Sequence, residues 1–287
     1  MPQVVFILST NYAGSHLLSQ LLSAHSACVA VGELHNYRKY REFRTRRDDE
    51  RNVVDDYETN PMFDGLDALP ENARHHHIFE NLRARQPAVS TLIDNSKKPA
   101  WPRRVGLAGS FDSRFVHLIR DPRALVRRWL SSYATTRVRR RQRIKLARTN
   151  PRHLLRACVG SDADVYLYKW LSANRDITRF LEEVDETAPV VTYHDLAVAP
   201  HATLQRLMPC WGLDFEPAQL DYGRAAQSGT RKRDYLALAA DSGIVFDTRW
   251  RNELTAEQRR TIETNREAKQ YLARLGIRMT DEGLTLG

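Results

Sequence analysis

The chain has 287 residues, of which 42% are hydrophobic, and its formal net charge is +9 at pH 7. This length is enough for one large α/β domain or two small ones, and no apolar run approaches the roughly 18 residues that a membrane-spanning helix needs. Three widely spaced cysteines form neither a disulfide framework nor a metal-binding pattern, so we expect a cytoplasmic protein. The basic balance indicates anionic partners without choosing among nucleic acid, lipid and a polyanionic substrate.

The first element is a strand, a small polar turn and a helix. Five consecutive apolar residues, Val4 to Leu8, predict a strand that is buried on both faces. Residues 9–15 are small and polar, and leucines then recur at helical spacing between Leu17 and Leu22. Such a unit points backbone N–H groups and the positive end of a helix at one place, which is typical of a phosphate site. Many parallel-sheet units bind nothing there, and the lysine-bearing triphosphatase pattern is absent.

A second apolar run, Cys28 to Val31, is followed by Gly32 and Glu33. A strand that ends here would place Glu33 at the carboxyl edge of a parallel sheet, where ligands of such sheets bind. Glu33 is therefore a candidate general base, and a solvated loop carboxylate is the alternative. Residues 36–88 are rich in charge and proline and predict an irregular insertion. Within it, the adjacent histidines 75–77 read as a surface tract rather than a metal cluster.

Two further strands are expected at 89–93 and 114–119, each followed by basic residues. Lys97 follows the first of these strands, in the run Asp94–Pro99. Arg120 follows the second, and Pro122 then opens a helix. Both basic side chains should lie on the ligand edge of the sheet, where an arginine can hold a phosphate through two hydrogen bonds.

The remaining chain alternates helices with one more strand. Residues 137–148 are dense in arginine and indicate either a polyanion-binding face or a solvated basic helix. Helices are expected at 164–184 and 203–211 around a strand at 189–193. A final helix is expected from a capping box at Thr255 to Leu275. This alternation predicts an α/β fold with a parallel sheet flanked by helices, and a single domain over 1–287.

The order of these units resembles the sulfotransferase family, which uses 3′-phosphoadenosine-5′-phosphosulfate (PAPS). Residues 9–18 resemble the family's loop for the 5′-phosphosulfate, and residues 115–129 resemble its 3′-phosphate segment, with Arg120 as the family's arginine. Residues 94–99 resemble the Asp-Ser-Ser-Lys motif of bacterial members, and residues 191–196 the Tyr-Glu-Asp-Leu strand. Residues 247–250 resemble part of the C-terminal region. The resemblance implies a P-loop-like sulfotransferase fold.

Glu33 resembles the Gly-Glu that follows the first helix in tyrosylprotein and related sulfotransferases, which implies that it is the base, and His35 is a second candidate base. Our hypothesis assigns charge stabilisation to Lys97, with His16 as a substitute for the missing loop lysine. The alternative for His16 is an ordinary residue at the start of the helix with its hydrogen bonds satisfied. The loop departs from the family pattern, because Tyr12 stands in its basic position, Ala13 in its serine position and His16 in a threonine position. Arg128 stands where the family has a serine for the 3′-phosphate. The residues expected to bind PAPS are Asn11, Tyr12, Ala13, Gly14, Ser15, His16, Leu17, Arg120, Arg128, Gly229, Arg231 and Lys232.

The expected function is transfer of a sulfuryl group from PAPS to a hydroxyl or amine of a small-molecule, glycan or lipid acceptor, without a metal. Three alternatives stay open. A kinase or nucleotidase would need magnesium with ATP. A nucleic-acid or polyanion binder would use residues 137–148 and bind in a salt-dependent way. A sulfotransferase-like protein that binds the nucleotide without turnover is compatible with Tyr12 and Arg128. We expect no nucleic-acid partner and no transmembrane segment, and the sequence names neither the acceptor nor the oligomeric state.

Overall fold

A computed structural model describes residues 2–39, 57, 60–106, 111–184, 187–221 and 244–287. Its main sheet has five strands in the order β2-β3-β1-β4-β5, and every pair of neighbours is parallel. This arrangement confirms the predicted α/β class. The strands are β1 (Gln3–Ser9), β2 (Cys28–Gly32), β3 (Thr91–Lys97), β4 (Asp112–Ile119) and β5 (Val190–Thr192).

The central strand β1 shows why the sheet is buried on both faces. Successive side chains of a strand point to opposite faces. Val4, Phe6 and Leu8 accordingly join one hydrophobic cluster, whereas Val5 and Ile7 join another. Helices therefore have to cover both faces, and they leave the carboxyl edge of the strands as the place for a site.

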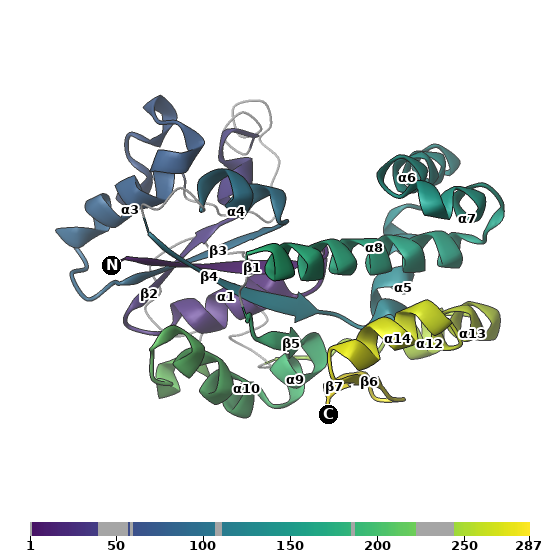
Figure 1. The fold of residues 1–287 in the computed structure, drawn as a ribbon. Helices are drawn as coiled ribbons and strands as arrows, with labels where there is room; N and C mark the ends of the chain where they lie inside the picture. The colour runs from purple at the N-terminus through teal and green to yellow at the C-terminus, as the bar shows by residue number, and fades with distance from the viewer. Residues whose placement is uncertain (1, 40–56, 58–59, 107–110, 185–186, 222–243) are drawn as a thin grey trace.

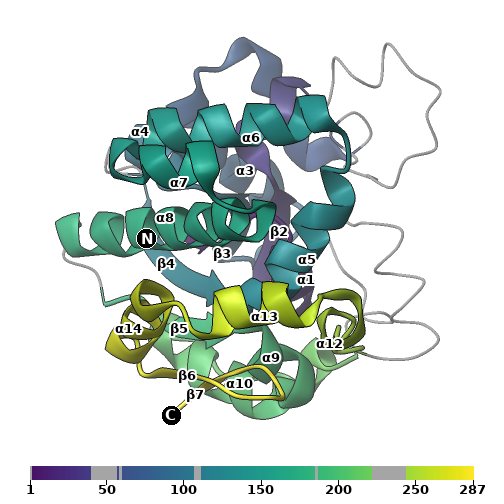
Figure 2. The same cartoon turned by 90° about the vertical axis from the view of Figure 1, so that its right-hand side faces the viewer.

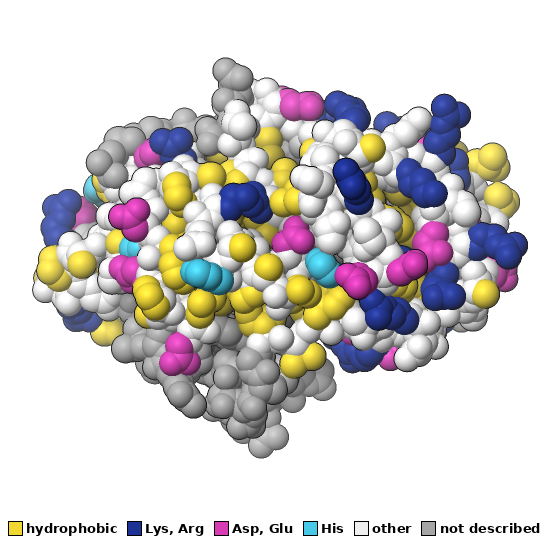
Figure 3. Space-filling view, turned by 90° about the horizontal axis from the view of Figure 1, so that it is seen from below, with side chains coloured by type: hydrophobic (Ala, Val, Ile, Leu, Met, Phe, Trp, Pro, Cys, Tyr) yellow, Lys and Arg dark blue, Asp and Glu magenta, His cyan; other side chains and the backbone are white. Residues whose placement is uncertain are grey.

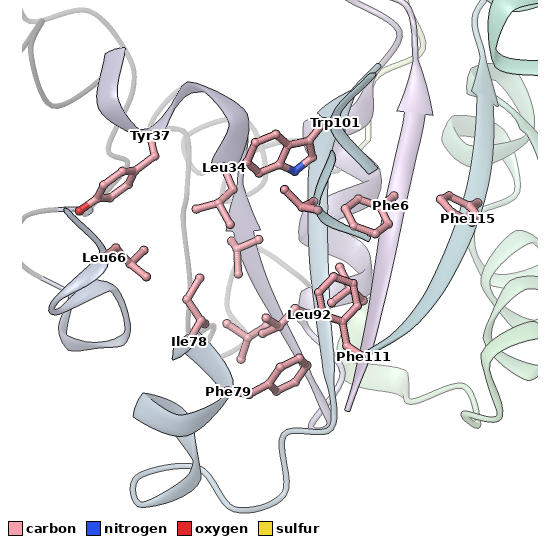
Figure 4. Packing of buried hydrophobic residues seen from close by; sticks show 14 of the residues in the cluster. Phe6, Leu34, Tyr37, Leu66, Ile78, Phe79, Leu92, Trp101, Phe111 and Phe115 are labelled. Atoms are coloured by element: carbon pink, nitrogen blue, oxygen red, sulfur yellow. The ribbon is translucent and has the colours of Figure 1, made fainter. Parts of the chain in front are cut away.

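Helices cover both faces of the sheet (Figure 1). On one face α1 (Ser15–Ser23) and α10 (Pro200–Leu207) supply leucines to the cluster that contains Val5, and α9 (Tyr193–Val198) follows β5 directly. On the other face lie α3 (Arg74–Arg83), α4 (Ala100–Val105) and part of α8 (Asp162–Glu183). Figure 4 shows this second cluster, in which aromatic and aliphatic side chains from the strands meet those of the segments that cover this face.

A further group of helices extends beyond the carboxyl end of the sheet. In Figure 2, α8 lies between α6 and α7 above and the C-terminal helices below, and side chains of these helices share a third hydrophobic cluster. These elements are α5 (Pro122–Ser132), α6 (Thr136–Thr149), α7 (Leu154–Val159), α12 (Trp250–Glu253), α13 (Ala256–Glu263) and α14 (Arg266–Arg274).

Two of the sequence expectations about elements are wrong. The single helix expected at 255–275 is two helices, because the Asn265 side chain accepts a hydrogen bond from Ala268 N and so begins α14 anew. The predicted capping box of Thr255 and Gln258 is present. The described part of residues 36–88 is less irregular than expected, since it contains α3. The sequence also gave no sign of the antiparallel pair β6 (Ile277–Met279) and β7 (Leu284–Leu286).

The positive charge of the chain does not form one uninterrupted surface. On the face seen in Figure 3, lysine and arginine side chains gather toward the right-hand end and alternate there with acidic ones. Within the arginine-rich helix α6, Arg139 and Arg143 both pair with Asp162 at the start of α8, at 3.1 and 2.7 Å. Part of the 137–148 run therefore serves to hold α6 against α8. Among the described residues no helix is long and apolar enough to cross a membrane.

Candidate functional site

The turn after β1 has the geometry of an anion site. Tyr12 and Gly14 both adopt left-handed backbone angles, with φ of 67° and 100°. The turn leads into α1, whose N-cap residue Gly14 makes no side-chain cap and whose first turn holds no acidic residue. The positive end of α1 thus points at the sheet edge without compensation from its own side chains, which favours an anion there.

Gly14 is required by a close neighbour as well as by its backbone angle. A Cβ atom at this position would lie 2.5 Å from Cδ2 of Tyr193. We expect Gly14→Ala to lower the free energy of unfolding by roughly 2–4 kcal/mol, because backbone strain and a clash with a packed ring add together. Urea unfolding measures this change.

Gly212→Ala is the matched control for Gly14→Ala. Gly212 also has a left-handed φ, of 68°, but a Cβ there would meet nothing within 4 Å. It should cost about 1–2 kcal/mol from backbone strain alone. Equal losses in the two variants would mean that Tyr193 moves aside and does not fix the turn.

Arg120 lies at the same edge as this turn. Its Nη1 donates to the Tyr12 carbonyl oxygen at 2.8 Å, and its Nη2 donates to Asp247 Oδ2 at 2.8 Å. Its guanidinium carbon lies 4.4 Å from the centre of the Tyr193 ring. Arg128 stacks over the Tyr12 ring at 4.9 Å. The structure therefore brings together the loop and both arginines that the sequence singled out.

The Asp247 carboxylate is paired with the guanidinium of Arg120. Burial alone would raise the pKa of Asp247, but hydrogen bonding from Arg249 and the charge of Arg120 lower it to about 2. The carboxylate is therefore ionised at neutral pH. An anionic ligand that used both Nη atoms of Arg120 would have to displace it.

Glu33 is the centre of a second polar cluster. It forms an ion pair with Lys97, accepts from Asn36 Nδ2 at 2.9 Å, and its Oε1 lies 3.2 Å from His16 Nε2. Burial alone would raise the pKa of Glu33, but the hydrogen bond to His16 and the charge of Lys97 hold it well below its usual range. The structure thus gathers the three residues expected to be catalytic. Asn95 joins them through its Nδ2, 3.0 Å from His16 Nδ1.

A buried carboxylate, Asp94, shapes the end of β3 beneath this cluster. It accepts from the Ser96 backbone N–H, from Trp101 Nε1 and, at 2.8 Å, bonds His75 Nε2. These bonds hold the bend at which Lys97 takes a left-handed φ of 71°. The expectation that histidines 75–77 form a surface tract is therefore wrong for His75, which is fully buried. Helical spacing turns its neighbours on α3 outward, and no local signal marks the inward one.

Several buried polar atoms at this edge have no hydrogen-bond partner among the described residues. Buried polar groups in folded proteins are normally paired, so such a group of atoms is typical of a site that a ligand completes. The partnerless atoms at this edge are Ser9 Oγ, Thr10 Oγ1, His35 Nδ1, Asn95 Oδ1 and Arg120 Nε.

Burial also lowers the pKa of the His35 imidazole, so that its ring is neutral near pH 7.

A cavity of about 520 Å³ opens beside the turn. Residues 9–11 of the turn and residues 97–100 at and after the end of β3 line it. Residues of α4, α5, α6 and α8 also line it, together with Tyr133 directly after α5. Its volume is in the range of small-molecule sites.

Some expected site residues do not present their side chains to this edge. The side chains of Ala13 and Leu17 belong to the core, so they can contribute only backbone atoms. Gly229, Arg231 and Lys232 lie outside the described residues, and so does the rest of the basic patch around them. Over the part of the chain that the structure describes, no group of three or more His, Cys, Asp and Glu side chains could hold a metal ion.

Comparison with known proteins gives a family. A sequence profile of the sulfotransferase family matches residues 2–217. The sulfotransferase domain from the curacin biosynthetic pathway matches over 96% of this chain and 98% of its own, with 18% identity and a TM-score of 0.52. At that identity the match shows the fold alone. A comparison with curated proteins finds no match.

Two other solved structures are similar at lower scores. The sulfotransferase domain from the olefin synthase of Synechococcus PCC 7002 matches over 91% of this chain and 94% of its own, with 19% identity and a TM-score of 0.46. A sulfotransferase from Alicyclobacillus acidocaldarius matches over 94% of this chain and 95% of its own, with 14% identity and a TM-score of 0.45.

Proposed function

Because the chain belongs to the sulfotransferase family, we propose that it transfers a sulfuryl group from PAPS to a hydroxyl or amine of an acceptor. The observation that carries the proposal is the meeting of the loop and Arg120 at one point, where Arg120 donates to the Tyr12 carbonyl oxygen. PAPS carries anionic groups at its 3′ and 5′ ends, and two anion sites at one sheet edge suit such a compound.

The two anion sites divide the nucleotide between them in this proposal. The 5′-phosphosulfate lies at the start of α1, where backbone N–H groups of residues 14–17 and the helix dipole favour negative charge. The 3′-phosphate lies against Arg120 and the exposed Arg128. Further polar contacts between these two anionic groups come from three partnerless groups, the hydroxyls of Ser9 and Thr10 and the Nε of Arg120.

The proposed chemistry needs an attacking oxygen and stabilisation of the leaving group. A new bond forms between the acceptor oxygen and sulfur while the bond from sulfur to the bridging oxygen breaks, and the acceptor proton leaves to a base. Charge then develops on the departing phosphate and on the sulfuryl oxygens, as in phosphoryl transfer. In this proposal Lys97 and His16 stabilise that charge, and their contacts with Glu33 at the same edge as the loop support the assignment.

Glu33 is the proposed base, and its ion pair with Lys97 keeps it weakly basic until the pair is broken. While the pair is intact the pKa of Glu33 is low, so its carboxylate is ionised but only weakly basic. If Lys97 turns to the sulfuryl oxygens, the carboxylate loses that charge and becomes a stronger base. His35, neutral and with a partnerless Nδ1, is the second candidate for the same proton.

A thermal-shift comparison tests the donor assignment. Adenosine 3′,5′-bisphosphate should raise the melting temperature well above the effect of AMP, ATP or DNA at equal concentration. A ligand present at 100 times its Kd stabilises the folded state by about 2.7 kcal/mol. Equal shifts from AMP and the bisphosphate would contradict the assignment, and a preference for ATP with magnesium would favour a kinase or nucleotidase.

A non-catalytic nucleotide binder is the second candidate, and one observation favours it. The loop contains no lysine, and Tyr12, which stands in its basic position, is engaged by Arg120 through its carbonyl and by Arg128 through its ring. Release of labelled bisphosphate from PAPS in the presence of a phenol panel separates the two candidates. Bisphosphate binding without any turnover would favour the binder.

A further inference from the structure

The cavity beside the turn has a basic wall that the donor assignment does not use. Lys98, Lys145 and Lys169 line it from the end of β3, from α6 and from α8. The cavity also contains two carboxylates, but each has its own arginine: Glu183 pairs with Arg103, and Asp176 pairs with Arg179. Among the described residues, no carboxylate pairs with any of the three lysines. Three ammonium groups of like charge thus share one cavity.

Lys169 is the most buried of these lysines. Its Nζ donates to Gln142 Oε1 at 2.9 Å and lies 4.5 Å from the Trp129 ring and 4.6 Å from the Tyr133 ring. Burial, together with the charges of Lys145 and Lys98, lowers the pKa of Lys169 to about 8. The side chain is still charged at neutral pH, in a setting that disfavours the charge until an anion arrives.

The rest of the cavity wall is apolar and aromatic. Trp129, Tyr133, Leu146 and Ile177 line it together with the lysines. Residues 9–11 and Lys97 also line the cavity, and sulfuryl transfer would occur beside them. A compound with an apolar body would fill such a cavity, with a hydroxyl toward Lys97 and an anionic group toward the lysines.

We propose that the acceptor is an anionic alcohol or phenol, whose carboxylate or similar anionic group is bound by Lys98, Lys145 and Lys169. This inference rests on the proposed function for the identity of the acceptor, whereas the binding of an anion by the three lysines can be measured without turnover. The three lysines would give the cavity a preference for anionic compounds that an apolar pocket alone would lack.

Two matched naphthols test the proposal. 6-Hydroxy-2-naphthoate and 6-hydroxy-2-naphthamide have nearly the same shape, and only the first carries a negative charge at pH 7. Their intrinsic fluorescence gives the Kd of each for the full-length protein, with and without adenosine 3′,5′-bisphosphate. We expect the naphthoate to bind about tenfold or more tightly than the amide, as a charge-assisted hydrogen bond in a partly buried site permits.

Charge-removing variants assign the preference to the lysines. The double variant Lys145→Gln with Lys169→Gln should reduce the preference to about twofold or less while leaving the affinity for the amide unchanged. Lys269→Gln, at an exposed position of α14 outside the cavity, is the control and should keep the full preference. Far-ultraviolet circular dichroism and the melting temperature show whether each variant is folded.

Each result of this experiment decides something. Equal binding of the two naphthols, binding of neither, or a preference that survives in the double variant would overturn the proposal. A large loss of bisphosphate affinity in the double variant would also overturn it, because the lysines would then belong to the nucleotide. If the bisphosphate does not bind but the naphthoate preference depends on the lysines, the donor assignment fails and the anion site stands.

Discussion

Replacing Glu33 by glutamine should lower kcat by about 100-fold or more and leave the affinity for adenosine 3′,5′-bisphosphate nearly unchanged. Glutamine keeps the size of the side chain but cannot take a proton from the acceptor. The affinity should persist because Glu33 contacts His16, Asn36 and Lys97, whereas the proposed nucleotide contacts are the loop backbone and Arg120. Steady-state kinetics with PAPS and a phenol acceptor, together with calorimetric titration of the bisphosphate, measure the two quantities.

The pH dependence of the wild-type enzyme adds a second reading of Glu33. The low pKa of this carboxyl keeps it ionised in the free protein, so kcat/KM should not fall through its protonation between about pH 8 and pH 5.

Glu216→Gln is the matched control for Glu33→Gln. Glu216 is also hydrogen-bonded and also has a lowered pKa, but its hydrogen bond is to Ser26. Turnover near the wild-type value in Glu33→Gln would remove Glu33 from the mechanism and turn attention to His35.

The sequence predicted which residues lie at this edge of the sheet better than it predicted their contacts. Glu33, Lys97 and Arg120 each follow an apolar strand, and parallel strands bring their carboxyl ends to one edge, so their common location follows from the order of strands and helices. The buried pair of His75 and Asp94 could not be predicted in this way. It joins α3 to β3, and the histidine run looks the same in the sequence whether one member is buried or none.

Contacts across long stretches of chain were the least accessible to sequence reasoning. Asp247 pairs with Arg120 across 127 positions, and nothing local to either residue indicates the pair. The same holds for the cavity, where Lys98, Lys145 and Lys169 come from three separate elements. The basic run at 137–148 showed only that α6 is charged. Tertiary packing decides that Arg139 and Arg143 bind Asp162 while Lys145 lines a cavity.

Arg120→Gln should raise the Kd of adenosine 3′,5′-bisphosphate by about 100-fold while changing that of AMP by roughly threefold or less. The guanidinium offers two Nη groups that now bind Tyr12 O and Asp247 Oδ2, and a partnerless Nε. Glutamine cannot provide a cationic fork for a phosphate. Loss of the pair with Asp247 would disturb the protein equally in both titrations, so the ratio of the two affinities isolates the 3′-phosphate.

Asp247→Asn is the complementary variant and should act in the opposite direction. It keeps Arg120 but removes the carboxylate that occupies it, whose pKa of about 2 means that it is charged at every pH of interest. The bisphosphate should then bind up to about tenfold more tightly, because the phosphate no longer competes with the half-buried Asp247 carboxylate for the guanidinium. Equal weakening of AMP and bisphosphate by Arg120→Gln, or weaker bisphosphate binding in Asp247→Asn with AMP unaffected, would place the 3′-phosphate elsewhere. In that case Arg120 would serve to join the loop to the segment that carries Asp247, and the donor site would have to be sought away from this pair.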